Sequence, residues 1–173
     1  PDGTFAPNAP ITRAQYAAFD PAYRVAAGTG HYPATGISFE DARRYAEWLS
    51  TKQGKKFRLP TEKEMSAHLK ASKTENTLDR WVGYEVNPDD GVTLSSSLNS
   101  LPADHLLMPV GSFPGKGDDP VFDLGGNAAE WVTADDGTGK LLGGSADIPV
   151  DAKLGWSPRR EYAGFRVVLD AGN

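Results

Sequence analysis

The sequence predicts an α+β domain, because helical patterns gather in its first half and short strand patterns in its second half. Three segments before residue 72 combine a helix-start signal with apolar residues at helical spacing. After residue 107, short strand-like runs are separated by turn clusters. Strands and helices do not alternate, so a parallel βαβ sheet is not expected.

Each expected helix opens with Ser or Thr as its N-cap, a residue type whose side chain satisfies an unpaired N–H of the first turn. The first is expected over Ile11–Phe19, ended by Asp20-Pro21. The second opens at Ser38 and stops at Gly54, with a buried stripe formed by Ala42, Tyr45, Ala46 and Leu49. The third opens at Thr61, with Glu64 completing a capping box, and runs to about Ala71.

A long surface loop is expected over Glu85–Ala103, since Asp, Ser, Asn, Pro and Gly recur there without periodicity. A short strand is considered inside it, at Val92–Leu94. Four further strands should form a small, irregular, antiparallel sheet. They are expected over Met108–Phe113, Ala129–Thr133, Lys140–Gly143 and Gly164–Leu169.

Composition indicates one globular domain over residues 1–173, and Pro1 suggests a piece excised or processed from a longer chain. The net charge is −5 and no basic stripe is interleaved with aromatic residues, which argues against a nucleic-acid partner. No apolar run approaches the roughly 20 residues of a transmembrane helix, so no transmembrane segment is expected. The chain has no cysteine, which excludes disulfides, thiolate metal sites and cysteine nucleophiles.

The segment DLGGNAAEW, residues 123–131, is the best candidate for a metal site. It supplies two carboxylates, Asp123 and Glu130, and calcium prefers such hard oxygen ligands together with backbone carbonyls. The two acids are too far apart for one helical face and can meet only if the chain folds back at Gly125-Gly126. The alternative is a plain turn with solvated acids.

A series of blocks resembles the sulfatase-modifying, formylglycine-generating enzyme domain in order and spacing, from about Ile11 to Leu169. The blocks are GISFEDAR (36–43), YAEWL (45–49), FRLPTE (57–62), VGSFP (110–114), DLGGNAAEW (123–131), GGS (143–145) and GFRV (164–167). The resemblance implies a C-type-lectin-like α+β fold that is poor in regular secondary structure.

Two calcium sites follow from the resemblance. The first would take the carboxylates of Asp123 and Glu130 and the carbonyls of Gly126 and Ala128. A second would use Asn99 with Ser100, and Asp104 with Leu106, although the spacing is shorter than the family's and Asn99 also suits a turn.

The family's enzymes oxidise a substrate cysteine to formylglycine through two copper-binding cysteines after the Gly-Gly-Ser block. Here Ile148 and roughly Lys153 occupy those positions, and neither side chain binds copper(I). The family reaction is therefore expected to be absent, and no catalytic residue is assigned. The three histidines are scattered, and His68 is expected to pack inside the fold.

Other large or charged side chains have expected structural roles. Arg58 and Arg166 should bind carboxylates or carbonyls at the edge of the core, and three tryptophans should fill an irregular core, namely Trp48, Trp81 and Trp131. A ligand or partner surface is expected in the loop-rich segment that replaces the reaction centre, the alternative being solvated arginines around a packed tryptophan. Its candidate residues are Asp147, Asp151, Trp156, Arg159, Arg160 and Tyr162.

The sequence thus predicts a non-catalytic, calcium-stabilised binding or regulatory domain whose partner is a protein or a small molecule. A regulator associated with a bacterial protein kinase or secretion system is one example, with a periplasmic or extracellular location. Two alternatives remain: a divergent oxidoreductase or part of a shared active site, and a displayed binder with a variable lectin-like face.

Overall fold

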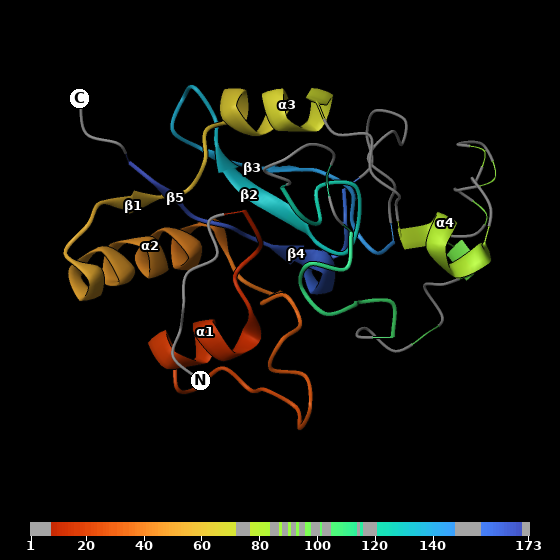
Figure 1. Cartoon of the computed structure of the whole chain (residues 1–173), viewed down its shortest axis with the longest axis horizontal. Helices are drawn as coiled ribbons and strands as arrows, with labels where there is room; N and C mark the ends of the chain where they lie inside the picture. The colour runs from red at the N-terminus through yellow and green to blue at the C-terminus, as the bar shows by residue number, and fades with distance from the viewer. Residues whose placement is uncertain are drawn as a thin grey trace.

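A computed structural model describes most of the chain (Figure 1). The described residues are 8–71, 77–83, 105–113, 121–147 and 157–170, with the isolated positions Asn87, Asp90, Thr93, Ser96, Ser97, Leu101 and Gly115. Among these residues, no helix is both long and apolar enough to cross a membrane.

The three helices expected in the first half are confirmed, as α1 (Arg13–Phe19), α2 (Phe39–Gln53) and α3 (Glu62–Ala71). Thr12 and Gln15 form a capping box at the start of α1, and the Ser38 hydroxyl accepts from the N–H of Asp41 at the start of α2. Helix α2 ends at Gly54, whose φ of 63° is the left-handed conformation that glycine adopts readily.

The strands of the described residues form two small sheets, one of them mixed. Strands β1 (Phe57–Arg58) and β5 (Val168–Leu169) pair antiparallel. In the other sheet β2 (Ala129–Thr133) is central, antiparallel to β3 (Gly139–Leu142) and parallel to β4 (Ala163–Gly164), which follows the 3-10 turn η1 (Arg160–Tyr162). The expected strands at 129–133 and 140–143 are confirmed, whereas that at 164–169 is two short strands, and 108–113 is irregular. The sheet is therefore not purely antiparallel.

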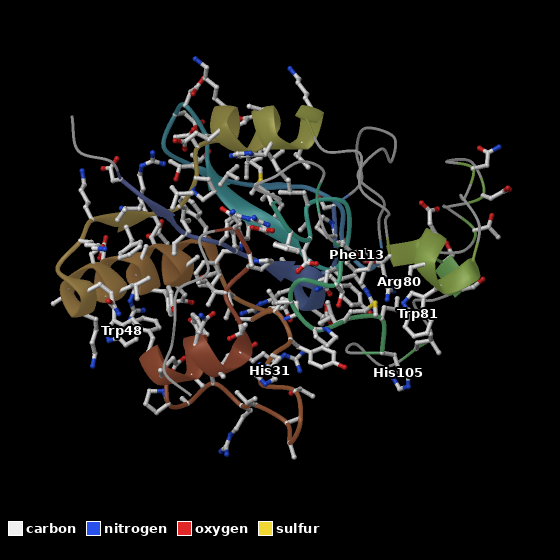
Figure 2. The ribbon with its side chains drawn as sticks, in the orientation of Figure 1. His31, Trp48, Arg80, Trp81, His105 and Phe113 are labelled. Atoms are coloured by element: carbon white, nitrogen blue, oxygen red, sulfur yellow. The ribbon has the colours of Figure 1, made fainter. Side chains whose placement is uncertain are left out.

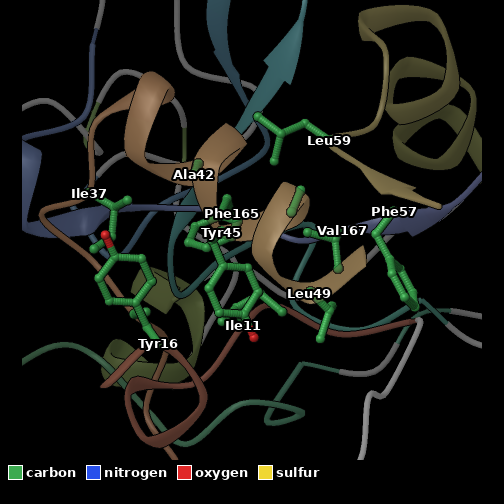
Figure 3. Close-up of a cluster of buried hydrophobic side chains, with 12 residues drawn as sticks. Ile11, Tyr16, Ile37, Ala42, Tyr45, Leu49, Phe57, Leu59, Phe165 and Val167 are labelled. Carbon is green, nitrogen blue, oxygen red and sulfur yellow. The ribbon is translucent and has the colours of Figure 1, made fainter. Parts of the chain in front are cut away.

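The main core joins the two ends of the chain around α2 (Figure 3). The stripe predicted for this helix is buried, and the ring of Tyr45 lies 5.3 Å from that of Phe165 near the C-terminus. The backbone N–H of Ile11, before α1, donates to the carbonyl of Phe165 at 2.9 Å. In Figure 1, α1 and α2 lie on one side of the β2–β3 hairpin and α3 on the other.

The structure corrects several expectations between residues 77 and 105. A helix, α4 (Thr77–Val82), was not anticipated, and the strand considered at 92–94 is wrong because Thr93 is helical. Asp90, Ser96 and Ser97 are helical as well, so the expected loop contains helix. Its other positions lie outside the described residues.

Two of the three tryptophans expected in the core are there. Trp48 and Trp131 pack against the main cluster, but Trp81 on α4 is 54% exposed, while its neighbour Arg80 lies against Phe113 (Figure 2). The expectation for Trp81 is therefore wrong. His68 is also exposed, because it occupies the outer face of α3.

The Thr61–Glu64 capping box also anchors Arg58, as expected for that arginine. The N–H of Thr61 donates to Glu64 Oε2 at 2.8 Å, and the N–H of Glu64 donates to Thr61 Oγ1 at 3.2 Å. Both carboxylate oxygens of Glu64 also accept from Arg58, each at 2.8 Å. These contacts, the Arg58 bonds above all, lower the pKa of Glu64 to about 2.

We expect Glu64→Gln to lower the free energy of unfolding by about 1 kcal/mol at pH 7. This is less than for a buried ion pair, because solvent screens the partly exposed pair of Glu64 and Arg58. The pKa of Glu64 is lower in the folded state, so its stabilisation is present above about pH 4.5 and is lost as the pH falls toward about 2. Urea unfolding at several pH values measures this. The control is Glu40→Gln, which removes an exposed acid at the start of α2 and should change the free energy of unfolding little. An equal loss of stability for Glu64→Gln at pH 7 and at pH 2 would contradict the prediction.

Candidate functional site

Asp123 is fully buried at the start of the DLGGNAAEW segment and organises the loop before it. Its Oδ2 accepts the backbone N–H of Gly111 at 2.7 Å and its Oδ1 accepts that of Phe113 at 3.0 Å. Burial, with a smaller contribution from the negative charge of Glu130, raises the pKa of Asp123 to about 6 against the opposing effect of these hydrogen bonds. The chain therefore does fold back to bring Asp123 near Glu130.

The chain bends over residues 123–127, which include Gly125 and Gly126, but the left-handed positions of this bend are not the glycines. Asp123 and Asn127 have positive φ, 62° and 70°, whereas Gly125 and Gly126 do not. Asp and Asn tolerate the left-handed region better than most residues because their short polar side chains bond locally. The two polar residues thus provide both the turns and the side-chain contacts.

Glu130 on β2 forms a buried, two-pronged ion pair with Arg166. Arg166 Nε donates to Oε2 at 2.6 Å and its second terminal nitrogen donates to Oε1 at 2.5 Å, and both side chains are at most 4% exposed. The same guanidinium donates to the carbonyls of Asn8, at 3.2 Å, and Phe122, at 2.7 Å. This confirms the carboxylate and carbonyl role expected for Arg166.

Asn127 is a site residue that the sequence reasoning did not assign. Its side-chain amide accepts from the N–H of Met108 and donates to the carbonyl of Met108, both at 3.0 Å. It thus makes the same pair of hydrogen bonds with Met108 that a residue of a neighbouring β-strand would make. Its own N–H donates to Thr77 Oγ1 at 2.7 Å. The only signal in the sequence was its place between Gly126 and Ala128.

The first calcium set is compatible with a hard cation in the type of its donors and in their charge. Asp123 and Glu130 are both buried carboxylates, and only Glu130 is paired directly with the positive charge of Arg166. Each carboxylate oxygen already accepts a hydrogen bond, so a cation would use the remaining lone pairs. Within the described parts of the chain, no three His, Cys, Asp or Glu side chains gather at one point, so the carbonyls of Gly126 and Ala128 would have to contribute.

Several predicted residues fall outside the described positions. For the second calcium site these are Asn99, Ser100 and Asp104, while Leu106 is buried in a small apolar cluster. For the former reaction centre they are Ile148, Lys153, Asp151 and Trp156.

The described part of the predicted ligand surface divides into buried and exposed residues. Ser145 Oγ donates to Asp147 Oδ1 at 2.6 Å, and Asp147 Oδ2 accepts the N–H of Arg159 at 3.3 Å. The guanidinium of Arg159 donates to the hydroxyl of Tyr162 at 3.0 Å, and Tyr162 is fully buried. Of the described members, only Arg160 is largely exposed.

We expect Arg166→Met to lower the free energy of unfolding by about 3–5 kcal/mol, because it leaves the buried carboxylate of Glu130 without a counter-charge. Adding Glu130→Gln to this variant should recover part of the loss, since the unpaired charge is then removed. Urea unfolding of the two single variants and the double variant measures the coupling. Arg58→Met, at a partly exposed pair, should cost clearly less; strictly additive losses at Glu130 and Arg166 would contradict the pairing.

Comparison with known proteins identifies the fold. Among solved structures, PvdO from Pseudomonas aeruginosa is similar, with a TM-score of 0.58 and 18% identity over 94% of this chain and 78% of that one. CarF is similar as well, with a TM-score of 0.54 and 18% identity over 92% of this chain and 83% of that one. No curated protein matches.

Two family models match the sequence. The S-layer homology domain matches residues 1–17 alone. The sulfatase-modifying factor enzyme 1-like domain matches residues 10–171, which include every element described above. The chain therefore belongs to the family of sulfatase-modifying factor enzyme 1-like domains, as its sequence blocks suggested, and has the α+β fold of its structural neighbours.

Proposed function

We propose that this member of the family is a non-catalytic binding or regulatory domain. The observation that carries the proposal is the complete absence of cysteine from a chain of this family. Formylglycine formation in the related enzymes needs two thiolates to hold copper(I), a soft metal that alkyl and ammonium groups do not bind. No residue in this chain supplies that ligand type.

The polar groups that follow the Gly-Gly-Ser block support the same proposal. Ser145 and Asp147 are buried, at 1% and 3% exposure; they bond to each other, and Asp147 also accepts the N–H of Arg159. A reactive group needs access to its substrate. The hydrogen bonds of Ser145 and Asp147 are instead used to connect the residue before η1 to the segment after β3. The network has the character of a structural support beside a binding surface.

Calcium is the second part of the proposal. Asp123 and Glu130 are buried, and Arg166 pairs with Glu130 alone, so a divalent cation would offset the remaining negative charge and keep Asp123 ionised. The proposed role is structural, because these residues join the loop at 111–113 to the central strand β2.

A location at the bacterial cell surface is the third part. The match of residues 1–17 to the S-layer homology domain favours it over a cytoplasmic one. The partner would then be a protein or a small molecule outside the cell.

The domain is expected not to convert a cysteine peptide to formylglycine. Aerobic incubation of the protein with copper and a sulfatase-motif peptide, followed by mass spectrometry, tests this. A cysteine-containing formylglycine-generating enzyme under identical conditions is the positive control. Conversion above a no-protein blank would overturn the non-catalytic proposal.

Calcium is expected to stabilise the folded domain by about 2.7 kcal/mol at a hundredfold excess over its dissociation constant, because it would bind the folded state alone. Thermal melting in calcium and in chelator measures the shift. Asp123→Asn should abolish the shift, while Asp136→Asn, in the exposed turn between β2 and β3, should retain it. Identical melting of the parent protein in calcium and in chelator would rule the site out.

A further inference from the structure

An open surface cavity of about 690 Å³ lies between the segment that follows α1 and the turn η1. Its volume is within the roughly 300–1,000 Å³ of small-molecule sites. Three arginines line it, Arg13, Arg24 and Arg160, with the single acid Glu161. The chain as a whole carries a net charge of −5, so this excess of positive charge is a local departure from the rest of the molecule.

The three guanidinium groups are held in different ways. Arg13 is buried, with its guanidinium 5.6 Å from the centre of the Tyr32 ring. Arg160 is exposed, and its Nε donates to the carbonyl of Gly36 at 3.1 Å. Arg24 is exposed and makes no side-chain hydrogen bond or ion pair with any residue that the structure describes. Arg24 and the terminal nitrogens of Arg160 therefore leave N–H donors for a ligand, since a guanidinium carries five.

Hydrogen bonds connect the segments that line the cavity. The hydroxyl of Tyr23 donates to the carbonyl of Thr35 at 3.0 Å and accepts the N–H of Thr35 at 3.2 Å. The N–H of Gly36 donates to the carbonyl of Arg160 at 3.1 Å, which joins two of the lining segments. These contacts pre-form the site and reduce the ordering cost of binding.

An apolar surface adjoins the charged one. Val25 is 37% exposed, although it is a large hydrophobic residue, and it lines the cavity beside Ala26 and the Tyr23 ring. A ligand with a charged end and an apolar body would use both parts of this lining.

We propose that this cavity binds a small anionic ligand, whose carboxylate or phosphate group is held by Arg24 and Arg160 and whose apolar body rests on Val25. Guanidinium groups suit both anions, because their paired N–H donors match two oxygens of one group. The inference rests on the proposed binding function and names the ligand class for it.

Titration calorimetry at low salt with four probes tests the proposal. Phenyl phosphate and benzoate should bind saturably at one site, inorganic phosphate more weakly, and neutral benzyl alcohol not at all. The ratio of the first two affinities shows which oxyanion the site prefers. Binding should weaken as salt is raised, because screening reduces the attraction between exposed charges.

Arg24→Gln and Arg160→Gln should each weaken phenyl phosphate binding at least about tenfold, the loss expected for a charge-assisted hydrogen bond. Both residues are exposed, so Arg24→Gln should melt like the parent, and Arg160→Gln should melt only slightly lower because it loses one exposed hydrogen bond to Gly36. The matched control is Arg43→Gln, which removes an exposed arginine on α2 that pairs with Glu40 and lies over the Phe39 ring, outside the cavity. It should leave the affinity unchanged.

Two outcomes would overturn the proposal: no saturable binding of either phenyl phosphate or benzoate, or an equal loss of affinity in Arg43→Gln and Arg24→Gln. Either result would leave the non-catalytic assignment standing, because that assignment depends on the peptide oxidation assay alone.

Discussion

The bond between Glu130 and Arg166 is the contact on which the rest of the fold depends, because it connects the central strand to three other segments. Glu130 lies on β2, Arg166 follows β4, and the same guanidinium holds the carbonyls of Asn8 and Phe122. Two buried charges are costly unless every lone pair and donor is used. Here four hydrogen bonds of Arg166, two to Glu130 and one each to the carbonyls of Asn8 and Phe122, offset that cost. The ion pair therefore determines how these segments are positioned more than it adds to the free energy of unfolding.

Elsewhere in the domain, side chains bonded to backbone groups replace regular strands. Asp123 binds two backbone N–H groups of the loop at 111–113, and Asn127 pairs with both polar groups of Met108. A buried loop must satisfy its polar groups in some way, and side chains do so without requiring a second strand. This explains how an irregular segment between residues 105 and 113 can bury Leu106, Leu107 and Phe113 without forming a strand.

The motif that suggested a metal site and the cavity suited to a ligand belong to different parts of the molecule. The carboxylates of the motif are enclosed at the base of the central sheet, where their bonds hold loops in place. The arginines of the cavity come from α1, the segment after it, and η1, and two of them are exposed. The residues that stabilise the fold are thereby different from those proposed to bind a ligand. Substitutions at the exposed arginines can therefore leave the buried Glu130–Arg166 pair undisturbed.

Local signals in the sequence determined the first half of the fold. The caps at Thr12, Ser38 and Thr61, the stripe on α2 and the stop at Gly54 depend on neighbours within a few residues, and the structure has them all. The sequence blocks also determined the family, and the type of partner for Arg58 and Arg166. The partner of Arg166 could not be predicted, because Glu130 and Arg166 are separated by 36 residues and meet only after β2 and β4 pair. The same is true of the parallel pairing, of Asn127 on Met108, and of the arginine cavity, whose members come from both ends of the chain. These features are contacts between distant segments, and the burial that makes them favourable exists only once the chain has folded.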